Sequence, residues 1–317
     1  MRIILDTDPG IDDSLAILYL SAQPDVDIVA VGSVHGNVPA PVAAANALRV
    51  LDVAGLDDVP VAVGAHRPLA QELRTAEFVH GDDGLGGHAG PPSPRAVVDC
   101  SAAEQLVRLA RANPGELSVL ALGPLTNIAL AVLLEPRLPE LLESLVVLGG
   151  ALGVPGNVTA HAEANIWHDP EAADLVFDTG FDNLTLVSLD VTETARADSA
   201  WLDSLAQVAS PRAQFASALL DHYAAFYSNM FGVRVATMHD PLAAALLCDP
   251  SLATYREVAV SVEVHGTYTR GQLVSDWRSI ADDSHIESEA GRGRRPVRAA
   301  AAVDAEEFLT RLFEALK

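Results

Sequence analysis

The chain of 317 residues is half apolar and carries a formal net charge of −23 at pH 7. A chain of this length and apolar content buries a large core, while its negative charge disfavours nucleic acid and anionic membranes as partners. The only lysine is the terminal Lys317, which excludes mechanisms that need an internal lysine, such as a Walker phosphate loop or a Schiff base.

Over residues 1–70, apolar runs of strand length alternate with amphipathic helical stretches. RIILD, DIVAVGSV and VPVAV predict strands over residues 2–6, 27–34 and 59–63, and the stretches between them predict helices over 12–23 and 41–55. This alternation is typical of parallel strands joined by helices.

Residues 81–94 interrupt the alternation. Their sequence, GDDGLGGHAGPPSP, is too rich in glycine and proline for regular structure. A stretch of this kind is either a plain surface loop or a mobile lid over a site, and the pattern leaves both alternatives open.

The alternation resumes at Ser101, which forms a capping box with Glu104 at the start of a helix. A later helix over 239–247 is expected to have Asp240 as its N-cap and Pro241 as its first residue. Further strands are expected over 117–122, 145–150, 183–190, 257–266, 271–277 and 295–303, with helices over 124–134, 169–180, 304–316 and two within 199–231. Because no repeat or low-complexity linker divides the chain, we expect a single α/β domain over residues 1–317 with an open, mostly parallel central sheet flanked by helices.

The stretch DTDPGIDD places Asp6, Asp8, Asp12 and Asp13 where the first strand passes into the first helix. Ligands of parallel sheets bind at such strand ends. Helix capping explains one carboxylate, but converging carboxylates repel one another unless a cation neutralises them. An all-oxygen set without nearby His or Cys favours calcium or magnesium over zinc. Asp12 and Asp13 lie about 100° apart around a helix axis, so they can serve different ligands.

Other polar groups follow strand ends elsewhere in the chain. Asn37 comes after the second strand, the carbonyl of Leu122 ends another, and His239 with Asp240 starts a helix. Each has an ordinary structural alternative, because an asparagine forms turns, an aspartate caps helices and a lone histidine is usually a structural hydrogen-bonding group.

The two cysteines, Cys100 and Cys248, are too few for a disulfide framework and favour a reducing compartment. The chain begins with the strand-like MRIIL, and no apolar run reaches the length of a bilayer. We therefore expect a cytoplasmic protein.

The motifs DTDPGIDD, VHGN, HGDDGLGG, LGPLTNIA, VVLGGAL, AEANIWHDPEAAD and HDP, in this order and at these spacings, resemble those of the inosine-uridine preferring nucleoside hydrolases. The resemblance extends from Ile3 to the C-terminal helix. It implies an open α/β core, a homodimer or homotetramer, and calcium-dependent hydrolysis of the N-glycosidic bond of ribonucleosides to free nucleobase and ribose.

The resemblance also implies a division of roles among residues. Calcium would be held by Asp8, by Asp13 in bidentate fashion, by Asp240 and by the backbone carbonyl of Leu122, with water and two ribose hydroxyls completing the shell. Asp8 would act as general base for the metal-bound water, and Asp12 would bind the ribose 2′-hydroxyl. The remaining ribose contacts implied are Asn37, Asn157, Glu163 and Asn165. His80 and His239 would face the nucleobase, with His239 assisting its departure.

Some positions depart from the family pattern. Ala164 stands where familiar relatives have Phe, Leu148 where Met is frequent, and Leu122 where Thr is common. Aromatic packing against the substrate is therefore absent at residue 164. Tyr223 and Tyr227 share one face of a helix, where they either close over the base or form a buried stripe.

Two other functions, one catalytic and one not, fit parts of the sequence. IILDTD also resembles the aspartate nucleophile of a haloacid-dehalogenase-like phosphatase, but that class needs an internal lysine. A non-catalytic calcium-dependent sugar-binding protein would keep Asp13 and Asp240 without needing Asp8 as a base. Within the family, another N-ribosyl compound, such as a modified nucleoside or nicotinamide riboside, is an alternative substrate.

We expect Asp6 to support the site from behind Asp8.

Overall fold

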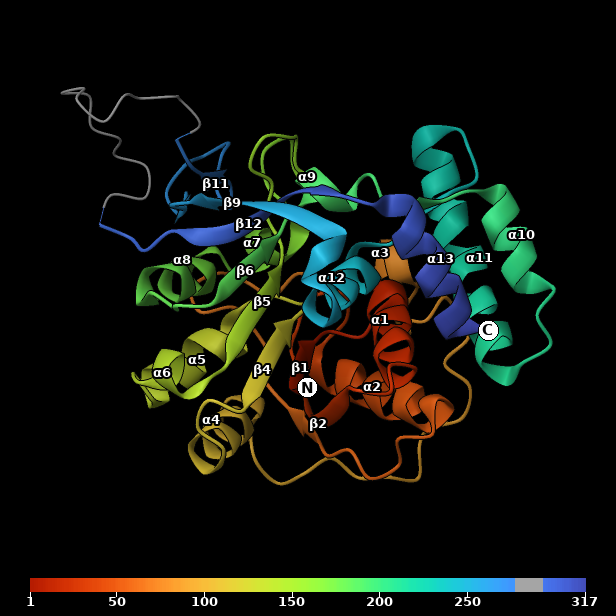
Figure 1. The fold of residues 1–317 in the computed structure, drawn as a ribbon, viewed down its shortest axis with the longest axis horizontal. Coiled ribbons are helices and arrows are strands. Elements are labelled where there is room, and N and C mark those ends of the chain that lie inside the picture. The colour runs from red at the N-terminus through yellow and green to blue at the C-terminus, as the bar shows by residue number, and fades with distance from the viewer. Residues whose placement is uncertain (277–292) are drawn as a thin grey trace.

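The computed structural model of the chain describes residues 1–276 and 293–317. Eight strands form one central sheet (Figure 1). Their order across the sheet is β3 (Val61–Val63), β2 (Asp27–Ser33), β1 (Arg2–Thr7), β4 (Leu117–Ala121), β5 (Ser144–Leu148), β6 (Leu184–Val187), β12 (Val297–Val303) and β9 (Ala253–Val258). Neighbouring strands run parallel except for β12 and β9 at one edge, which are antiparallel. The predicted open, mostly parallel sheet is confirmed.

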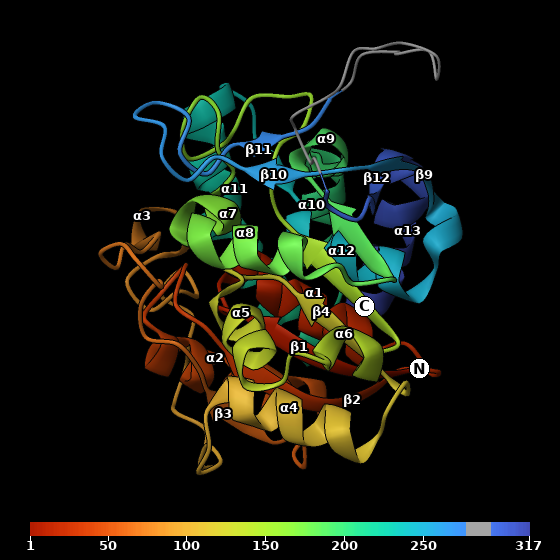
Figure 2. The ribbon, with the colours of Figure 1, turned by 90° about the vertical axis from the view of Figure 1, so that its left-hand side faces the viewer.

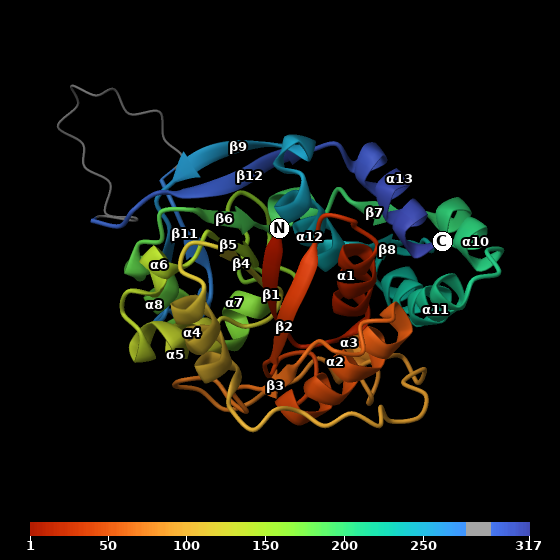
Figure 3. The ribbon, with the colours of Figure 1, turned by 60° about the horizontal axis from the view of Figure 1, so that its bottom comes forward.

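Helices cover both faces of this sheet, as Figures 2 and 3 show. One face carries α1 (Ile11–Ser21), α2 (Ala40–Ala54), α11 (Pro211–Phe231), α12 (His239–Cys248) and α13 (Ala305–Leu316). The other carries α4 (Ala102–Ala112), α5 (Thr126–Leu134), α6 (Leu138–Leu141) and α8 (Pro170–Thr179). Each layer buries its own apolar cluster against the sheet, so the carboxyl ends of the strands are held between two packed layers.

The register of β1 determines where its acidic continuation lies. β1 pairs with β2 up to Thr7 and Ser33, and with β4 up to Asp6 and Ala121. The Leu122 amide then donates to the carbonyl of Asp6 over 2.8 Å. The chain that follows β1 therefore leaves the sheet beside the ends of β2 and β4, which brings their following loops to one place.

Several smaller elements complete the described residues. They are α3 (Glu77–His80), α7 (Ala164–His168), α9 (Leu189–Thr192), α10 (Ser199–Ala206), the 3-10 helix η1 (Pro250–Leu252) and the two-stranded pairs β7 (Arg196–Ala197) with β8 (Ala236–Thr237) and β10 (Ser261–Val262) with β11 (Leu273–Val274). None of the helices in the described residues is both long and apolar enough to span a membrane.

Two helix starts test the capping predictions. The capping box is confirmed, because the Glu104 amide donates to Ser101 Oγ over 3.2 Å and the Ser101 amide donates to Glu104 Oε2 over 2.9 Å. The prediction of Asp240 as N-cap is wrong. α12 begins at His239 with Met238 as its cap residue, so Asp240 lies inside the first turn and its side chain is free to face the neighbouring helix α1.

The strand predicted over residues 257–266 is also wrong as one element. β9 ends at Val258, and the apolar alternation continues into β10, which pairs with β11 outside the main sheet. Alternation reports a half-buried extended segment but not its pairing partner, so it could not reveal this break. The strand predicted over 271–277 is short, and Trp277 lies outside the described residues.

Candidate active site

Two glycines make room for the side chain of Asp8 at the end of β1. A Cβ atom on Gly36 would overlap Asp8 Oδ2, and one on Gly123 would lie 2.6 Å from Asp8 Oδ1. Gly10 has a similar role, because its Cβ would lie 2.6 Å from His80 Nδ1. The glycines of DTDPGIDD, VHGN and LGPLTN are thus explained by close approach of the backbone to polar side chains.

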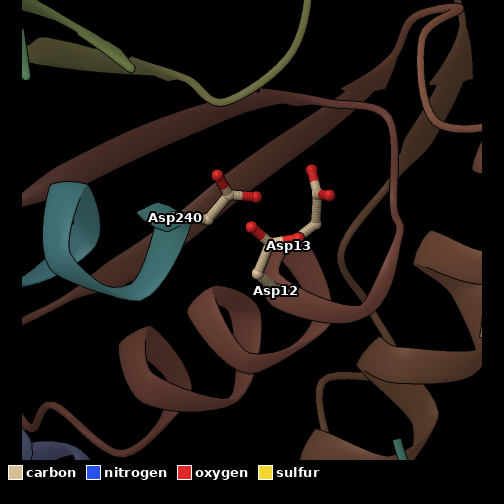
Figure 4. A group of neighbouring side chains, drawn as sticks. All are labelled: Asp12, Asp13 and Asp240. Atoms are coloured by element: carbon tan, nitrogen blue, oxygen red, sulfur yellow. The ribbon is translucent and has the colours of Figure 1, made fainter. Parts of the chain in front are cut away.

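The starts of α1 and α12 bring three carboxylates together. Ligand atoms of Asp12, Asp13 and Asp240 all lie within 4.8 Å of one another, and Figure 4 shows the side chains converging from the two helices. Asp8 interacts with Asp12 and Asp13 through their charges. We call these four residues, Asp8, Asp12, Asp13 and Asp240, the acidic floor.

Hydrogen bonds fix the orientation of the floor. Asp13 accepts from Thr7 Oγ1, from the Gly10 amide over 3.0 Å and from Asn37 Nδ2 over 2.9 Å. The Asn37 backbone amide donates to Asp8 Oδ2 over 2.6 Å. Asn37 therefore holds two carboxylates of the floor in place as well as lining the cavity described below.

No cationic side chain among the described residues pairs with the acidic floor. Burial raises the pKa of Asp12 to about 7, and burial followed by repulsion from neighbouring aspartates raises the pKa values of Asp8 and Asp240 well above their usual range. The ion pairs among the described residues include none of the four carboxylates. Asp8 Oδ1 is buried and has no hydrogen-bond partner in the described part of the chain. This donor set fits a hard divalent cation such as Ca²⁺ or Mg²⁺.

A backbone carbonyl adjoins the floor. Asn165 Nδ2 donates to the carbonyl oxygen of Leu122 over 2.6 Å and to that of Leu148 over 3.2 Å. A carbonyl oxygen has two lone pairs, so the Leu122 carbonyl keeps one for a cation. The Asn165 side chain is thereby committed to orienting this group.

A cavity of about 380 Å³ opens above the floor. It is lined by every predicted site residue except Asp8 and Asp13, namely Asp12, Asn37, His80, Leu122, Asn157, Glu163, Asn165, Tyr223, Tyr227, His239 and Asp240. Its volume suits a small molecule of nucleoside size. Residues from seven separate stretches of the sequence therefore meet around one space.

One side of this cavity is a group of aromatic rings, which we call the aromatic wall: His80, Tyr223, Tyr227 and His239. Tyr227 Oη lies 3.1 Å from His239 Nε2 and donates to Tyr223 Oη over 3.4 Å. Tyr223 Oη in turn donates to Asp12 Oδ2 over 3.2 Å. A chain of hydrogen bonds thus joins the aromatic wall to the acidic floor.

Both histidines of the aromatic wall are neutral at pH 7. Burial lowers the pKa of His80 to about 3 and that of His239 to about 4. His80 Nδ1 accepts from the Ile11 amide over 3.1 Å, so the ring proton resides on Nε2. His239 Nδ1 lies 2.7 Å from Thr192 Oγ1. His80 Nε2 can therefore donate a hydrogen bond without carrying charge, whereas both ring nitrogens of His239 already lie within hydrogen-bond distance of Thr192 and Tyr227.

The AEANI segment is held by hydrogen bonds between side chains and backbone amides. Glu163 caps α7 by accepting from the amides of Asn165 over 2.8 Å and Ile166 over 3.1 Å, and it also accepts from Gly150 over 2.7 Å. Asn157 Oδ1 accepts from the Ala164 amide over 3.0 Å. Both side chains line the cavity while fixing the segment that carries them.

Asp6 is buried in β1, and burial raises its pKa to about 7. Asn127 Nδ2 donates to Asp6 Oδ1 over 2.7 Å and also to the carbonyl of Ser33 over 2.9 Å. Asn127 thus ties Asp6 of β1 and the end of β2 to the start of α5.

The 81–94 loop is anchored at its first half. Asp83 accepts from the amides of Leu85 and Gly87, both over 2.9 Å, and Asn46 Nδ2 donates to the Asp83 carbonyl over 2.8 Å. A Cβ on Gly86 would lie 2.7 Å from His222 Cβ, so the loop packs closely on α11.

Sequence reasoning missed several contributors. Thr7 holds Asp13 and Thr192 holds His239. Thr7 lies inside DTDPGIDD but had no assigned role, and no motif marks Thr192. Arg74 and Trp167 line the cavity, although Trp167 had no assigned role. The only available signal was position, because Trp167 lies within the AEANIW motif and Arg74 lies shortly before VHGDDG.

The chain is similar to known proteins in sequence and in fold. The family model described as inosine-uridine preferring nucleoside hydrolase matches residues 3–310. A protein of Arabidopsis thaliana described as probable uridine nucleosidase 2 is 42% identical, over 85% of this chain and 84% of its own length. A solved plant nucleoside hydrolase has a TM-score of 0.94 and 36% identity, covering 99% of this chain and 98% of its own. The purine-preferring ribonucleoside hydrolase from Gardnerella vaginalis has a TM-score of 0.90 and 30% identity, covering 100% and 98% of the two chains.

Proposed function

Because the chain belongs to the family of inosine-uridine preferring nucleoside hydrolases, we propose that it hydrolyses the N-glycosidic bond of ribonucleosides in a calcium-dependent reaction, releasing free nucleobase and ribose. The observation that carries this proposal is the uncompensated acidic floor beneath a cavity of about 380 Å³. Uridine and inosine are the first substrates to consider, because the family description names both and a relative is described as a uridine nucleosidase.

Asp8, Asp13, Asp240 and the carbonyl oxygen of Leu122 would hold the Ca²⁺. Asp12 lies close to Asp13 and Asp240, so its carboxylate is also a candidate ligand of the cation. We nevertheless assign Asp12 to the ribose 2′-hydroxyl. When bound, Ca²⁺ supplies charge compensation, orientation of the ribose diol and a lowered pKa for a neighbouring water.

Asp8 is the general base. Its Oδ2 accepts from the Asn37 amide, while its buried Oδ1 is free to accept a proton from the attacking water. Glycoside cleavage gives the sugar oxocarbenium character, so the negative charge of the floor stabilises the transition state more than the ground state. The other ribose contacts are Asn37, Asn157, Glu163 and Asn165.

The aromatic wall receives the nucleobase. His80 stacks on Tyr223 with ring centroids 5.6 Å apart and directs its Nε2 proton away from the backbone. His239 and Tyr227 form a hydrogen-bonded pair that assists departure of the base, which otherwise leaves as an anion. Because His239 is neutral, its assistance takes the form of hydrogen bonding together with Tyr227 Oη.

We further propose one domain over residues 1–317, a homodimer or homotetramer, and a cytoplasmic location. The continuous central sheet supports the single domain, and the two unpaired cysteines support a reducing compartment.

A panel of ribonucleosides tests the proposal. Calcium-loaded protein is incubated with uridine, inosine, cytidine, adenosine and nicotinamide riboside, and ribose is measured as reducing sugar. Release of ribose from uridine or inosine is the expected result. Release from nicotinamide riboside alone would favour the alternative of another N-ribosyl substrate. Binding of ribose without cleavage of any member would favour a non-catalytic calcium-dependent sugar-binding protein.

A further inference from the structure

Glu193 is a cavity-lining carboxylate that the proposed reaction does not use. It directly follows α9 and is next to Thr192, whose Oγ1 lies 2.7 Å from His239 Nδ1. α9 packs against α12, which carries His239. Burial lowers the pKa of His239 to about 4, and the charge of Glu193 opposes this shift. The Glu193 carboxylate therefore lies close enough to the aromatic wall to act on it electrostatically.

The position of Glu193 is fixed through Arg196. Arg196 Nη2 donates to Glu193 Oε2, and the guanidinium lies over the Phe231 ring, 4.7 Å from its centroid. Phe231 in turn stacks on Tyr227, with ring centroids 5.5 Å apart. The backbone of Arg196 pairs with that of Thr237 in the strands β7 and β8, just before α12 begins. Side-chain and backbone contacts thus hold the pair of Glu193 and Arg196 against the aromatic wall.

One oxygen of Glu193 is not used within the described chain. Over residues 1–276 and 293–317, Arg196 is the only hydrogen-bond donor to the Glu193 side chain, and it contacts Oε2. Glu193 lines the cavity with its side chain 29% exposed, whereas Arg196 does not line it. The start of α9 and the last turns of α11 line the cavity with apolar side chains, namely Leu189, Phe226 and Met230. Glu193 Oε1 is thus a hydrogen-bond acceptor at this end of the cavity.

The pairing with Arg196 also matters for the charge at this end of the cavity. The base departs with negative charge, and a lone carboxylate beside it would raise the barrier to departure. The guanidinium of Arg196 compensates the charge of Glu193. The pair therefore offers an acceptor to the base without adding net negative charge.

The Watson–Crick edges of the bases differ in what they present to an acceptor. Uracil carries N–H at N3 and hypoxanthine at N1, whereas cytosine and adenine have a bare nitrogen with a lone pair at these positions. In uracil, N3–H lies next to O2, one of the atoms that takes up negative charge as the C1′–N bond breaks. A uracil that is hydrogen-bonded at O2 by the aromatic wall therefore presents N3–H to the groups that border this wall.

We infer that Glu193 determines the base specificity of this protein, because its Oε1 accepts a hydrogen bond from the ring N–H of the base. This inference rests on the proposed function. Uracil and hypoxanthine are favoured over cytosine and adenine, since a bare ring nitrogen would place its lone pair against the carboxylate and leave both groups without a hydrogen bond. Glu193 selects the base and transfers no proton.

Glu193→Ala tests the contact by comparing uridine with 3-methyluridine. It should lower kcat/KM for uridine about tenfold or more and that for 3-methyluridine less than about twofold, because 3-methyluridine has no N3–H to lose. Glu140→Ala is the matched control and should equal wild type. Glu140 pairs with Arg137 three residues away, as Glu193 does with Arg196, but it does not line the cavity. Inosine and 1-methylinosine form the equivalent pair if the panel shows inosine to be cleaved.

Glu193→Gln keeps the shape of the side chain and changes what it offers to the base. Because Arg196 is a donor, it holds the amide carbonyl oxygen and leaves the NH2 group toward the cavity. This NH2 group opposes N3–H of uridine but donates to the bare N3 of cytidine. The ratio of kcat/KM for uridine to that for cytidine should therefore fall roughly tenfold or more, and the ratio for inosine to adenosine should fall likewise. Glu140→Gln should leave both ratios unchanged.

Other outcomes overturn the inference in distinguishable ways. Unchanged ratios in Glu193→Gln refute it. Equal losses for uridine and 3-methyluridine in Glu193→Ala would show that Glu193 only supports the structure of the aromatic wall, and they refute it as well. In both cases wild type still releases base, so the proposed function stands. No base from any nucleoside in wild type contradicts the proposed function itself, and the inference with it.

A binding measurement separates recognition of the base from turnover. Uridine and 3-methyluridine, or inosine and 1-methylinosine, are titrated by calorimetry into the Asp8→Asn protein, in which cleavage is slow. The unmethylated nucleoside should bind more tightly, and adding Glu193→Ala should reduce the ratio of the two affinities roughly tenfold. The same ratio in both proteins would show that the methyl group clashes elsewhere and would refute the inference.

Discussion

The acidic floor and the aromatic wall of the cavity are built in different ways. The floor comes from two short stretches, DTDPGIDD and HDP, and backbone amides and glycines fix its carboxylates. The wall comes from α3, α11 and α12, and its rings contact one another as well as the Ile11 amide, Asp12 and Thr192. In the proposed function the floor acts on the sugar, while the wall contacts the base. Substitutions in the floor should affect all substrates alike, and substitutions in the wall should discriminate among them.

The largest effect is expected from Asp8→Asn in the floor. The amide keeps the shape of the side chain but cannot take a proton from water, so kcat should fall by about 10³ or more for every nucleoside. Steady-state kinetics on uridine and inosine measure it, with Asp57→Asn, at an exposed position, as control. A fall in kcat for only one of the two nucleosides would contradict the proposed difference between the floor and the wall.

Asp12 and Asp13 separate two roles within the floor. Asp12→Ala should lower turnover by roughly 10² because it removes a contact to the ribose, while one Ca²⁺ per chain remains bound. Asp13→Ala should lose the metal, because Asp13 is the carboxylate that Thr7, Gly10 and Asn37 orient. The calcium content of each variant after gel filtration shows which of the two aspartates holds the metal. Loss of calcium from Asp12→Ala would reverse the assignment, consistent with the closeness of Asp12 to Asp240.

Tyr227→Phe tests the aromatic wall. It removes the hydroxyl that contacts His239, so kcat on uridine should fall about tenfold. A p-nitrophenyl riboside, whose leaving group departs as a stable anion, should be cleaved at an unchanged rate. An equal loss on both substrates would show that Tyr227 acts on the sugar through Tyr223 and Asp12 instead of on the base.

The smallest effect is a pH dependence of stability. Burial raises the pKa values of Asp6 and Asp12 from 3.8 to about 7. Between pH 3.8 and about pH 7, the folded metal-free protein holds protons that the unfolded chain has released. Its free energy of unfolding therefore falls as the pH rises through this range. Bound Ca²⁺ keeps the floor ionised and offsets this loss. The rise in Tm on exchanging EGTA for Ca²⁺ should therefore be larger at pH 8 than at pH 5, by about 2 °C or more.

The histidines do not obscure this comparison. Burial lowers the pKa values of His35 and His168 from 6.5 to about 3 and about 4, which costs stability as pH falls below 6.5. That cost is the same with and without calcium and cancels in the difference. An equal Tm gain at the two pH values would mean that the floor is not where calcium binds.

The sequence predicted the sheet and the acidic floor well because both depend on local signals. Apolar alternation predicted the parallel strands, and a strand end followed by DTDPGIDD indicated converging carboxylates. Asp240 was recognised through the resemblance but wrongly placed as a cap, because composition at a helix start does not distinguish a cap from a side chain turned toward another helix. The break between β9 and β10, and the pairing of β10 with β11, were missed because alternation carries no information about pairing partners.

The walls of the cavity were harder to predict because their contacts join distant segments. Tyr227 and His239 lie 3.1 Å apart across two helices, and no spacing rule reveals that contact. Thr192 had no pattern at all, since its contact with His239 arises only when α9 folds against the site.

The central claim is that calcium on the acidic floor is required for cleavage of the nucleoside. The most direct test strips the protein with EGTA, titrates Ca²⁺ back and follows base release from uridine or inosine, whichever the panel shows to be cleaved. The account predicts negligible release without calcium and a rise that saturates at one Ca²⁺ per chain. A full rate of release in the stripped protein would contradict it.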